Sequence, residues 1–198
     1  MKAEGGMTMY EPNQLVEQAI LFAAEAHRGQ LRKGSNTPYI LHPLEAAAIV
    51  AGLTDDPEVI AAAVLHDVLE DTSATPGELE AAFGPRVMAL VQSESENKRP
   101  HLDPRDSWQL RKQEALEELA AACPAAQAVA LGDKLSNIRA IRRDYRALGE
   151  ELWQRFNQSD KAKQGWYYRS LGQALSGLCR TDPWQEYTRL TEEVFGRP

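Results

Sequence analysis

The segment at residues 65–72 reads LHDVLEDT and places four polar side chains at the end of an apolar run. His66 and Asp67 stand side by side, and Glu70 and Asp71 follow about one helical turn later. On a continuous helix, residues four apart share a face, so His66 would stack on Glu70 and Asp67 on Asp71. Burying unpaired carboxylates costs several kcal/mol each. The segment is therefore either a helix end that faces solvent or a site in which a ligand compensates the charges.

Two other positions carry side chains of the same kinds beside apolar sequence. His42 lies in YILHPLEA, and Asp133 lies in AVALGDKLSNIR. Imidazole nitrogens and carboxylate oxygens together suit Mn, Fe, Co or Zn. Cys123 and Cys179 lack a CxxC spacing, so we expect inert buried thiols rather than a cysteine zinc site. These observations favour a divalent metal site over a solvent-facing helix end.

The elements that must position these residues are helices. Residues 13–28 repeat apolar side chains at helical spacing behind Asn13, a candidate N-cap. Prolines at the first helical position would start helices at Pro43, Pro57 and Pro124. No segment alternates convincingly with a period of two, so we predict an all-α fold. The expected helices are residues 13–28, 43–53, 57–72, 76–84, 85–93, 105–122, 124–143, 147–157 and 160–178.

Length and composition indicate a single domain in solution. The chain has 198 residues, of which 26% are charged and 43% hydrophobic, enough for one cored domain and short for two. The net charge of -7 argues against nonspecific nucleic-acid binding. Neither a membrane span nor a signal-peptide core is apparent. We therefore expect a cytoplasmic protein with no nucleic-acid or membrane partner, a flexible segment at residues 1–12 and one domain over residues 13–198.

Three motifs in order resemble a known enzyme family. The runs AHRGQLRKGSNTPYILHP, LHDVLEDT and LGDKLSNIR look like the metal-dependent HD hydrolase domain of the RelA/SpoT homologues. They are more similar still to the free-standing small alarmone hydrolases, which include the metazoan SpoT homologue. Three motifs in the right order are a stronger signal than an isolated His-Asp pair. The resemblance covers roughly residues 14–178 and implies a single-domain, all-helical HD phosphohydrolase fold.

The resemblance also implies a role for each matching residue. The expected ligands of one divalent ion, usually Mn2+ in this family, are His42, His66, Asp67 and Asp133. Glu70 and Asp71 match the acidic pair that handles the attacking water. Arg32 and Lys33 match the basic pair of a loop that reaches the nucleotide, and Asn137 matches an asparagine that contacts the ribose.

The residue types suit phosphoryl chemistry. A divalent ion lowers the pKa of a bound water from about 15.7 to about 7.

Tyr167 or Tyr168 would contact the base or ribose, whereas Trp108 is expected to be a core anchor. No P-loop appears, so ATP-driven synthesis is not expected. The candidate cations for a diphosphate are Arg32, Lys33, Lys98, Arg111, Lys112 and Lys134.

The sequence departs from the family pattern in two places. The usual LADK is LGDK here, and Gly132 is expected to loosen its helix by up to ~1 kcal/mol relative to Ala. The stretch after LV, commonly a Thr followed by acidic and basic residues, reads QSESENKRPHLD. That stretch helps to form the substrate pocket in the family, so the departure bears on which base is accepted.

We therefore expect a hydrolase that removes pyrophosphate from the 3′ position of guanosine tetra- or pentaphosphate and leaves GDP or GTP. One alternative is another nucleotide, such as an adenosine 3′-pyrophosphate or the 2′-phosphate of NADPH. A second alternative is a regulatory module that binds the alarmone without hydrolysing it, although the intact HD and ED pairs argue against this. The sequence leaves the base, the native metal and the oligomeric state open.

Overall fold

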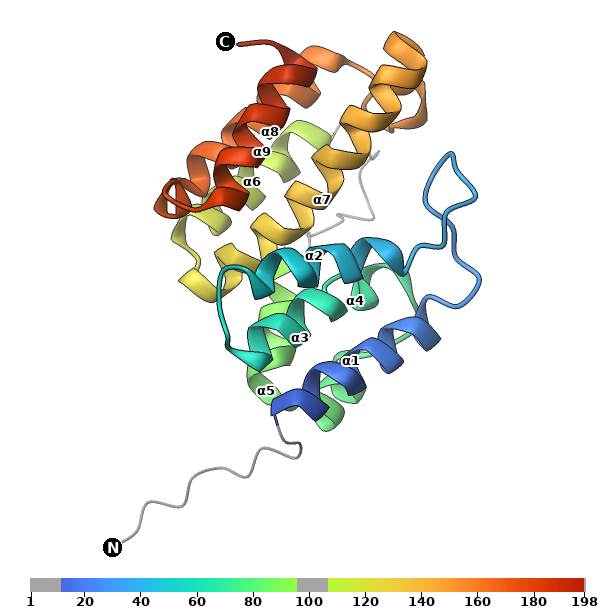
Figure 1. Cartoon of the computed structure of the whole chain (residues 1–198), viewed down its shortest axis with the longest axis vertical. Helices are drawn as coiled ribbons and strands as arrows, with labels where there is room; N and C mark the ends of the chain where they lie inside the picture. The colour runs from blue at the N-terminus through green and yellow to red at the C-terminus, as the bar shows by residue number, and fades with distance from the viewer. Residues whose placement is uncertain (1–11, 96–106, 198) are drawn as a thin grey trace, which may run out of the picture.

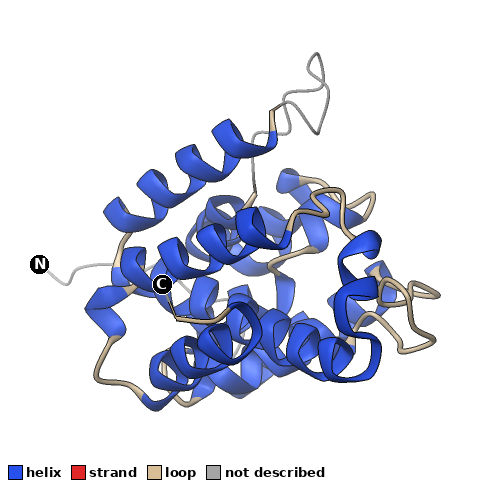
Figure 2. Cartoon of the chain, turned by 90° about the horizontal axis from the view of Figure 1, so that it is seen from above, coloured by secondary structure: helices blue, strands red, loops and turns tan. Residues whose placement is uncertain are grey.

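The computed structural model describes residues 12–95 and 107–197 of the chain. Every regular element in these ranges is helical, and one isolated β-bridge pairs Leu31 with Pro38 (Figure 2). The predicted all-α fold is therefore confirmed. The α-helices are α1 (Pro12–Ala26), α2 (Leu41–Ala51), α3 (Pro57–Leu65), α4 (Val68–Asp71), α5 (Pro76–Glu94), α6 (Trp108–Ala121), α7 (Pro124–Leu148), α8 (Lys161–Ala174) and α9 (Asp182–Phe195), and the 3-10 helices are η1 (Gly149–Arg155) and η2 (Ser176–Leu178).

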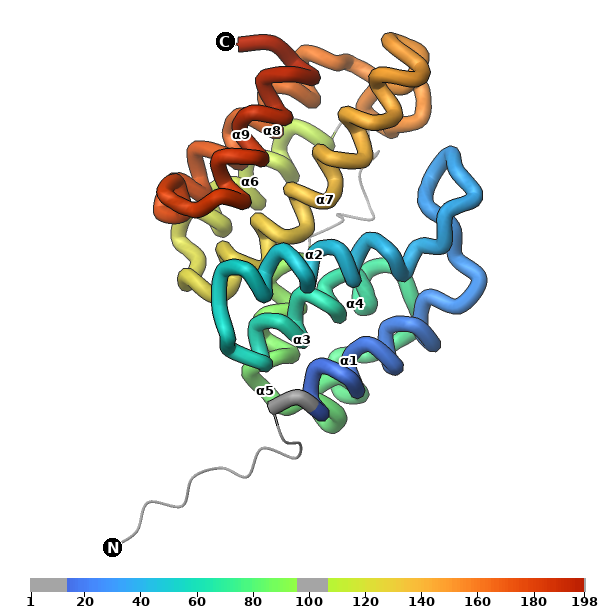
Figure 3. The backbone as a smooth tube through the Cα atoms, in the orientation of Figure 1, coloured from blue at the N-terminus to red at the C-terminus, as the bar shows by residue number. Residues whose placement is uncertain are grey.

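Two hydrophobic clusters meet along α2 and α7. The first lies mainly among α1, α3 and α5 and includes the fully buried Leu65 and Leu79. The second lies among α6, α7, α8 and α9 and includes Leu171 and Tyr187. In Figure 1, α1 to α5 form the lower part, and α7 climbs from the middle beside α6, α8 and α9. The tube in Figure 3 shows α2 crossing the foot of α7 between the two parts.

The crossing of α2 and α7 depends on a glycine. A Cβ atom at Gly132 would lie 2.7 Å from Cγ2 of Val50 and 2.8 Å from the carbonyl oxygen of Ala46. Both distances are shorter than van der Waals contact, so α7 could not approach the α2 backbone this closely with Ala. Gly132, expected only to loosen its helix, therefore lets α2 and α7 pack closely, and these helices carry two of the expected metal ligands.

Side-chain caps start several of the helices. Asp56, Asp160 and Thr181 accept hydrogen bonds from backbone N–H groups in the first turns of α3, α8 and α9. Thr75 forms a capping box with Glu78 at the start of α5. The helix α9 was not predicted, although Thr181 followed by a proline at residue 183 is a typical start signal.

The expected continuous helix at residues 57–72 is wrong. The helix α3 ends at Leu65, and α4 begins at Val68, so His66 and Asp67 lie in the turn between them. Both residues nevertheless keep dihedral angles in the right-handed helical region, and the N–H of Asp71 donates to the carbonyl oxygen of Asp67 at 2.9 Å. Asp67 therefore still lies one turn before Asp71, as expected.

Other expectations need smaller corrections. The helix α2 begins at Leu41, so Pro43 is its third residue rather than its first. The two helices expected on either side of Gly84 need no correction: α5 contains both, and they meet at a kink where Gly84 has a non-helical φ of 84°. Most of the stretch at residues 147–157 is a 3-10 helix, η1. The two cysteines, Cys123 and Cys179, are exposed rather than buried. Of the expected flexible segment, residues 1–11 lie outside the described residues.

None of the described helices combines the length and apolar character needed to cross a membrane.

Replacing Gly132 with Ala should destabilise the protein even though Ala is the better helix former. The added methyl group would overlap Val50 and the Ala46 carbonyl, and overpacking of this kind costs about 1–3 kcal/mol. Gly172→Ala in α8 is the matched control, because a Cβ there would make an ordinary 3.6 Å contact with Tyr187. Urea unfolding of the three proteins checks this prediction. A Gly132→Ala variant as stable as the Gly172→Ala variant would contradict it.

Candidate metal centre

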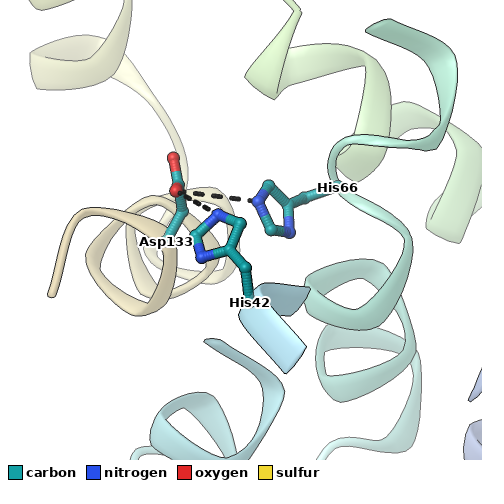
Figure 4. Close-up of side chains that lie close together, drawn as sticks. All are labelled: His42, His66 and Asp133. Carbon is teal, nitrogen blue, oxygen red and sulfur yellow. Dashed lines mark ion pairs between the residues drawn. The ribbon is translucent and has the colours of Figure 1, made fainter. Parts of the chain in front are cut away.

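Three buried side chains from different parts of the chain converge on one point (Figure 4). His42 comes from the first turn of α2, His66 from the turn after α3, and Asp133 from α7. Their exposed fractions are 4%, 1% and 5%. Oδ1 of Asp133 lies 3.1 Å from Nε2 of His42 and 3.7 Å from Nε2 of His66. One donor atom from each residue therefore lies within 4.8 Å of the others, a spacing that suits a single metal ion.

Asp67 reaches the same point from the turn between α3 and α4. Its Oδ2 atom lies 3.0 Å from Nε2 of His66 and 3.4 Å from Nε2 of His42. His66 and Asp67, adjacent in sequence, therefore face one site. The structure thus brings together the four residues expected as ligands, two imidazoles and two carboxylates.

Hydrogen bonds orient both imidazole rings. Nδ1 of His66 donates to the carbonyl oxygen of Ala63 at 2.8 Å. Nδ1 of His42 lies 2.8 Å from Oγ of Ser136, which donates in turn to Oε2 of Glu45 at 2.7 Å. With the proton on Nδ1, each ring presents the lone pair of Nε2 to the site, as a metal ligand must. Nε2 of His66 is buried and has no hydrogen-bond partner of normal geometry. This donor set fits a divalent ion.

The charges in the cluster compensate one another in the absence of a metal ion. Burial alone would lower the pKa of His66, but the carboxylates of Asp67 and Asp133 raise it well above its usual value. Burial opposes ionisation of Asp133, yet Lys134 and the imidazoles hold its pKa well below the usual range. The imidazolium form supplies the positive charge that a metal ion would otherwise supply. Metal binding should therefore release protons.

The cluster opens into a pocket of about 190 Å³. Glu70 lines this pocket, whereas Asp71 is exposed and its Oδ2 atom accepts a hydrogen bond from Tyr39 at 2.9 Å. The acidic pair expected to handle water is thus divided, and only Glu70 faces the metal ligands. The other residues around the pocket, besides the four ligands, are Arg32, Tyr39, Glu94, Lys112, Lys134 and Asn137.

Several residues that are expected to contact the substrate lie in or beside this pocket, and some of them also line a second pocket. Nη2 of Arg32 donates to Oδ1 of Asn137 at 2.9 Å, and Asn137 in turn donates to Asp133. Lys134 forms an ion pair with Asp133. The second pocket, of about 290 Å³, shares Arg32, Tyr39 and Asn137 with the first. It is also lined by Lys33, Tyr168, Phe156, Arg143 and Arg155.

The remaining candidates fall elsewhere. Tyr167 faces a third pocket, of about 150 Å³, together with Glu94 and Lys134, and Nζ of Lys112 lies 4.6 Å from its ring centre. Trp108 is buried against Trp166 and Tyr167, as expected of a core anchor. Nε of Arg111 donates to Oγ of Ser107 at 3.3 Å, and Arg111 does not line the metal pocket. Lys98 lies outside the described residues.

Sequence reasoning assigned no role to several residues of these pockets, Phe156 among them. Glu94, Arg143 and Arg155 carry charge but occupy no recognisable motif. Tyr39 was noted only as part of the PYILHP motif, and its place three residues before His42 was the available signal.

Known proteins resemble this chain in sequence and in structure. A family model described as an HD domain matches residues 19–158. The guanosine-3′,5′-bis(diphosphate) 3′-pyrophosphohydrolase MESH1 of Mus musculus is 42% identical over 138 residues, which cover 67% of this chain and 72% of that protein. The bifunctional (p)ppGpp synthase/hydrolase SpoT of Escherichia coli K12 is 48% identical over 80 residues, 40% of this chain and 11% of that protein. A solved structure of a metazoan ortholog of SpoT that hydrolyzes ppGpp has a TM-score of 0.75 and 26% identity, covering 95% of this chain and 99% of that one.

Divalent metal should stabilise the protein through the four-residue cluster. A ligand present at 100 times its Kd adds about 2.7 kcal/mol to the stability of the folded state, so Mn2+ should raise the melting temperature of the chelator-treated protein. His66→Ala should abolish this shift. Glu186→Gln, which removes a carboxylate that pairs with Arg139 instead, should preserve it. Equal shifts in both variants would place the ion elsewhere.

Glu94 should make the stability of the metal-free protein depend on pH. Burial raises the pKa of Glu94 from its usual 4.5 to about 7, although Lys134 opposes the shift. The folded state therefore holds this proton more tightly than the unfolded state. The contribution of protonated Glu94 to the free energy of unfolding is complete below pH 4.5 and is lost as the pH rises toward about 7.

Glu94→Gln should consequently raise the free energy of unfolding at about pH 8 and raise it much less at about pH 5, where only part of the difference has developed. Denaturant titrations of chelator-treated wild type and variant at both pH values measure this difference. An equal effect at the two pH values would show that ionisation of Glu94 is not responsible.

Proposed function

The chain belongs to the HD domain family, and on this premise we propose that it is a metal-dependent hydrolase that removes pyrophosphate from the 3′ position of guanosine 3′,5′-bis(diphosphate). The observation that carries the proposal is the buried cluster of two imidazoles and two carboxylates, open to pockets lined by cations. The relatives named for this reaction support the choice of substrate.

We propose that His42, His66, Asp67 and Asp133 hold one Mn2+ ion. Two imidazoles make the site less suitable for Mg2+, which prefers oxygen ligands and retained waters. The bound ion would supply Lewis acidity and a water of lowered pKa.

Glu70 would orient the attacking water and take its proton; its position in the lining of the pocket beside the proposed ligands supports this role. The water would attack the phosphorus attached to the ribose 3′ oxygen, and the bond between them would break, so that the 3′ oxygen leaves with a proton and the attacked phosphorus departs in pyrophosphate. Arg32, Lys112 and Lys134 surround the same space and would neutralise the charge of the diphosphate under attack. Negative charge that develops on its phosphoryl oxygens would therefore meet cations already in place.

The second pocket suits the rest of the nucleotide. Tyr168 and Phe156 offer aromatic walls for a base or ribose, and Asn137 stands between the two pockets. Lys33, Arg143 and Arg155 provide positive charge for the 5′-diphosphate. Tyr167, which faces the third pocket, is a weaker candidate for contact with substrate than Tyr168. The cytoplasmic location expected from the sequence stays a prediction.

A nucleotide panel with Mn2+ tests the proposed reaction. The substrates are the 3′-diphosphates of guanosine and adenosine nucleotides and NADPH, and the products are separated into pyrophosphate and orthophosphate. We expect pyrophosphate and GDP from guanosine 3′,5′-bis(diphosphate). Orthophosphate from NADPH alone would identify a different substrate. Bound metal with no product from any nucleotide would identify a binding module.

Glu70→Gln should lower kcat by roughly 10²- to 10⁴-fold, the usual contribution of general acid-base catalysis. Glutamine keeps the shape of the side chain but cannot accept the proton of water, so metal content and melting temperature should stay near those of wild type. Asp71→Asn is the matched control and should reduce kcat less, because Asp71 does not line the pocket. Equal losses of kcat in the two variants would contradict the assignment of different roles to Glu70 and Asp71.

A further inference from the structure

Tyr39 joins the substrate loop to the metal ligands. Its backbone N–H donates to the carbonyl oxygen of Gln30 at 2.9 Å and so closes the loop of residues 30–39. Its phenol oxygen lies 2.6 Å from Oδ2 of Asp67 and 2.9 Å from Oδ2 of Asp71. Oδ2 of Asp67 is also the atom that faces both imidazoles. One hydroxyl group is therefore within hydrogen-bonding distance of two acceptors, the metal-facing oxygen of Asp67 and the carboxylate of the exposed Asp71.

The ring of Tyr39 makes a separate set of contacts. Its centre lies 4.9 Å from the ring centre of the buried His27 and 5.9 Å from that of His42. The guanidinium carbon of Arg32 lies 5.7 Å from the ring centre. His27 is fixed in turn by Gln30, whose Oε1 lies 2.9 Å from Nδ1 of His27. These contacts fix the ring, and therefore the direction of its hydroxyl group, independently of the two carboxylates.

We propose that Tyr39 is a positioning residue that couples Asp71 to the metal ion. Its hydroxyl orients Asp67 for metal binding, and Asp71 competes for the same hydrogen. Asp71 then acts on the metal site through Tyr39 and not by contact with the attacking water. The role in catalysis rests on the proposed function, whereas the role in metal binding rests on the contacts of Tyr39 alone.

The hydroxyl and the ring should have separable effects. Groups that hydrogen-bond to metal ligands typically account for 10- to 100-fold in metal affinity or activity. The hydroxyl contacts the metal-facing carboxylate, whereas the ring contacts Arg32, an expected substrate residue. Removing only the hydroxyl should therefore weaken metal binding and leave nucleotide binding almost intact.

Tyr39→Phe tests the role of the hydroxyl because it keeps the ring. The affinity for Mn2+ is measured on chelator-treated protein by competition with a fluorescent chelator. We expect the Kd for Mn2+ to rise about 10- to 100-fold. At saturating Mn2+, the KM for guanosine 3′,5′-bis(diphosphate) should change less than about twofold. An unchanged Kd, or an effect confined to KM, would overturn the proposal.

Tyr145→Phe is the matched control. The hydroxyl of Tyr145 also donates to a carboxylate, at 2.6 Å from Oε1 of Glu150, and its ring also lies beside a cation, Lys161. Because it does not line the metal pocket or the second pocket, this variant should leave the Kd for Mn2+ and the KM unchanged. A loss of Mn2+ affinity equal to that of Tyr39→Phe would make the effect of the hydroxyl nonspecific and would overturn the proposal.

A double-mutant cycle with Asp71→Asn tests the coupling itself. The measurements use about 1 M salt, where the Debye length is about 3 Å and the exposed charge of Asp71 is screened. We expect Asp71→Asn to change the Kd for Mn2+ when Tyr39 is present, and to change it at least about threefold less in the Tyr39→Phe background. Equal changes in both backgrounds would overturn the coupling.

Two further outcomes remain distinguishable. If Tyr39→Phe does not fold, as judged by circular dichroism, Asp71→Asn alone tests the proposal at high salt, and an unchanged Kd for Mn2+ overturns it. If wild type cleaves no nucleotide, the proposed function fails, but the Mn2+ titrations still decide whether Tyr39 positions Asp67.

Discussion

The structure depends on compensating charge at the point where its two hydrophobic clusters meet. Two imidazoles and two carboxylates lie within a few ångströms of one another, and three of these four side chains are at most 5% exposed. Charges withdrawn from water in this way cost several kcal/mol each unless a partner is present. A divalent ion bound as proposed would satisfy both carboxylates and both Nε2 lone pairs together. The same arrangement leaves an open side on which a phosphoryl group can be bound.

The packing of several helices is needed to bring these four side chains together. The four proposed ligands come from α2, from the turn between α3 and α4, and from α7, so no single element contains the site. Gly132 allows α7 to approach the backbone of α2, and two adjacent residues that follow Leu65 reach one point. The loop before α2 is held to α7 by the hydrogen bond from Arg32 to Asn137. Metal binding and substrate binding therefore share the same supports.

Sequence patterns and the family resemblance predicted the helical elements and which four side chains converge better than they predicted the details of the site. Prolines and capping residues mark helix starts because their chemistry is local, as at Pro57 and Pro124. The break after Leu65 was missed because its apolar run reads as one helix, and only packing against other helices reveals the turn. The hydroxyl contacts of Tyr39 join it to Asp67 and Asp71, which lie 28 and 32 positions further along the chain. Such long-range contacts leave no periodic signal in a single sequence.

The central claim is that one divalent ion binds where these four side chains converge, and anomalous X-ray diffraction tests it most directly. Crystals of the full chain grown with Mn2+ would be measured on both sides of the manganese absorption edge. We expect a single strong anomalous peak within about 2.5 Å of Nε2 of His42, Nε2 of His66 and a carboxylate oxygen of Asp133, with Asp67 completing the set. A crystal that shows no anomalous peak at this point, or a peak only at exposed acidic side chains, would contradict the account.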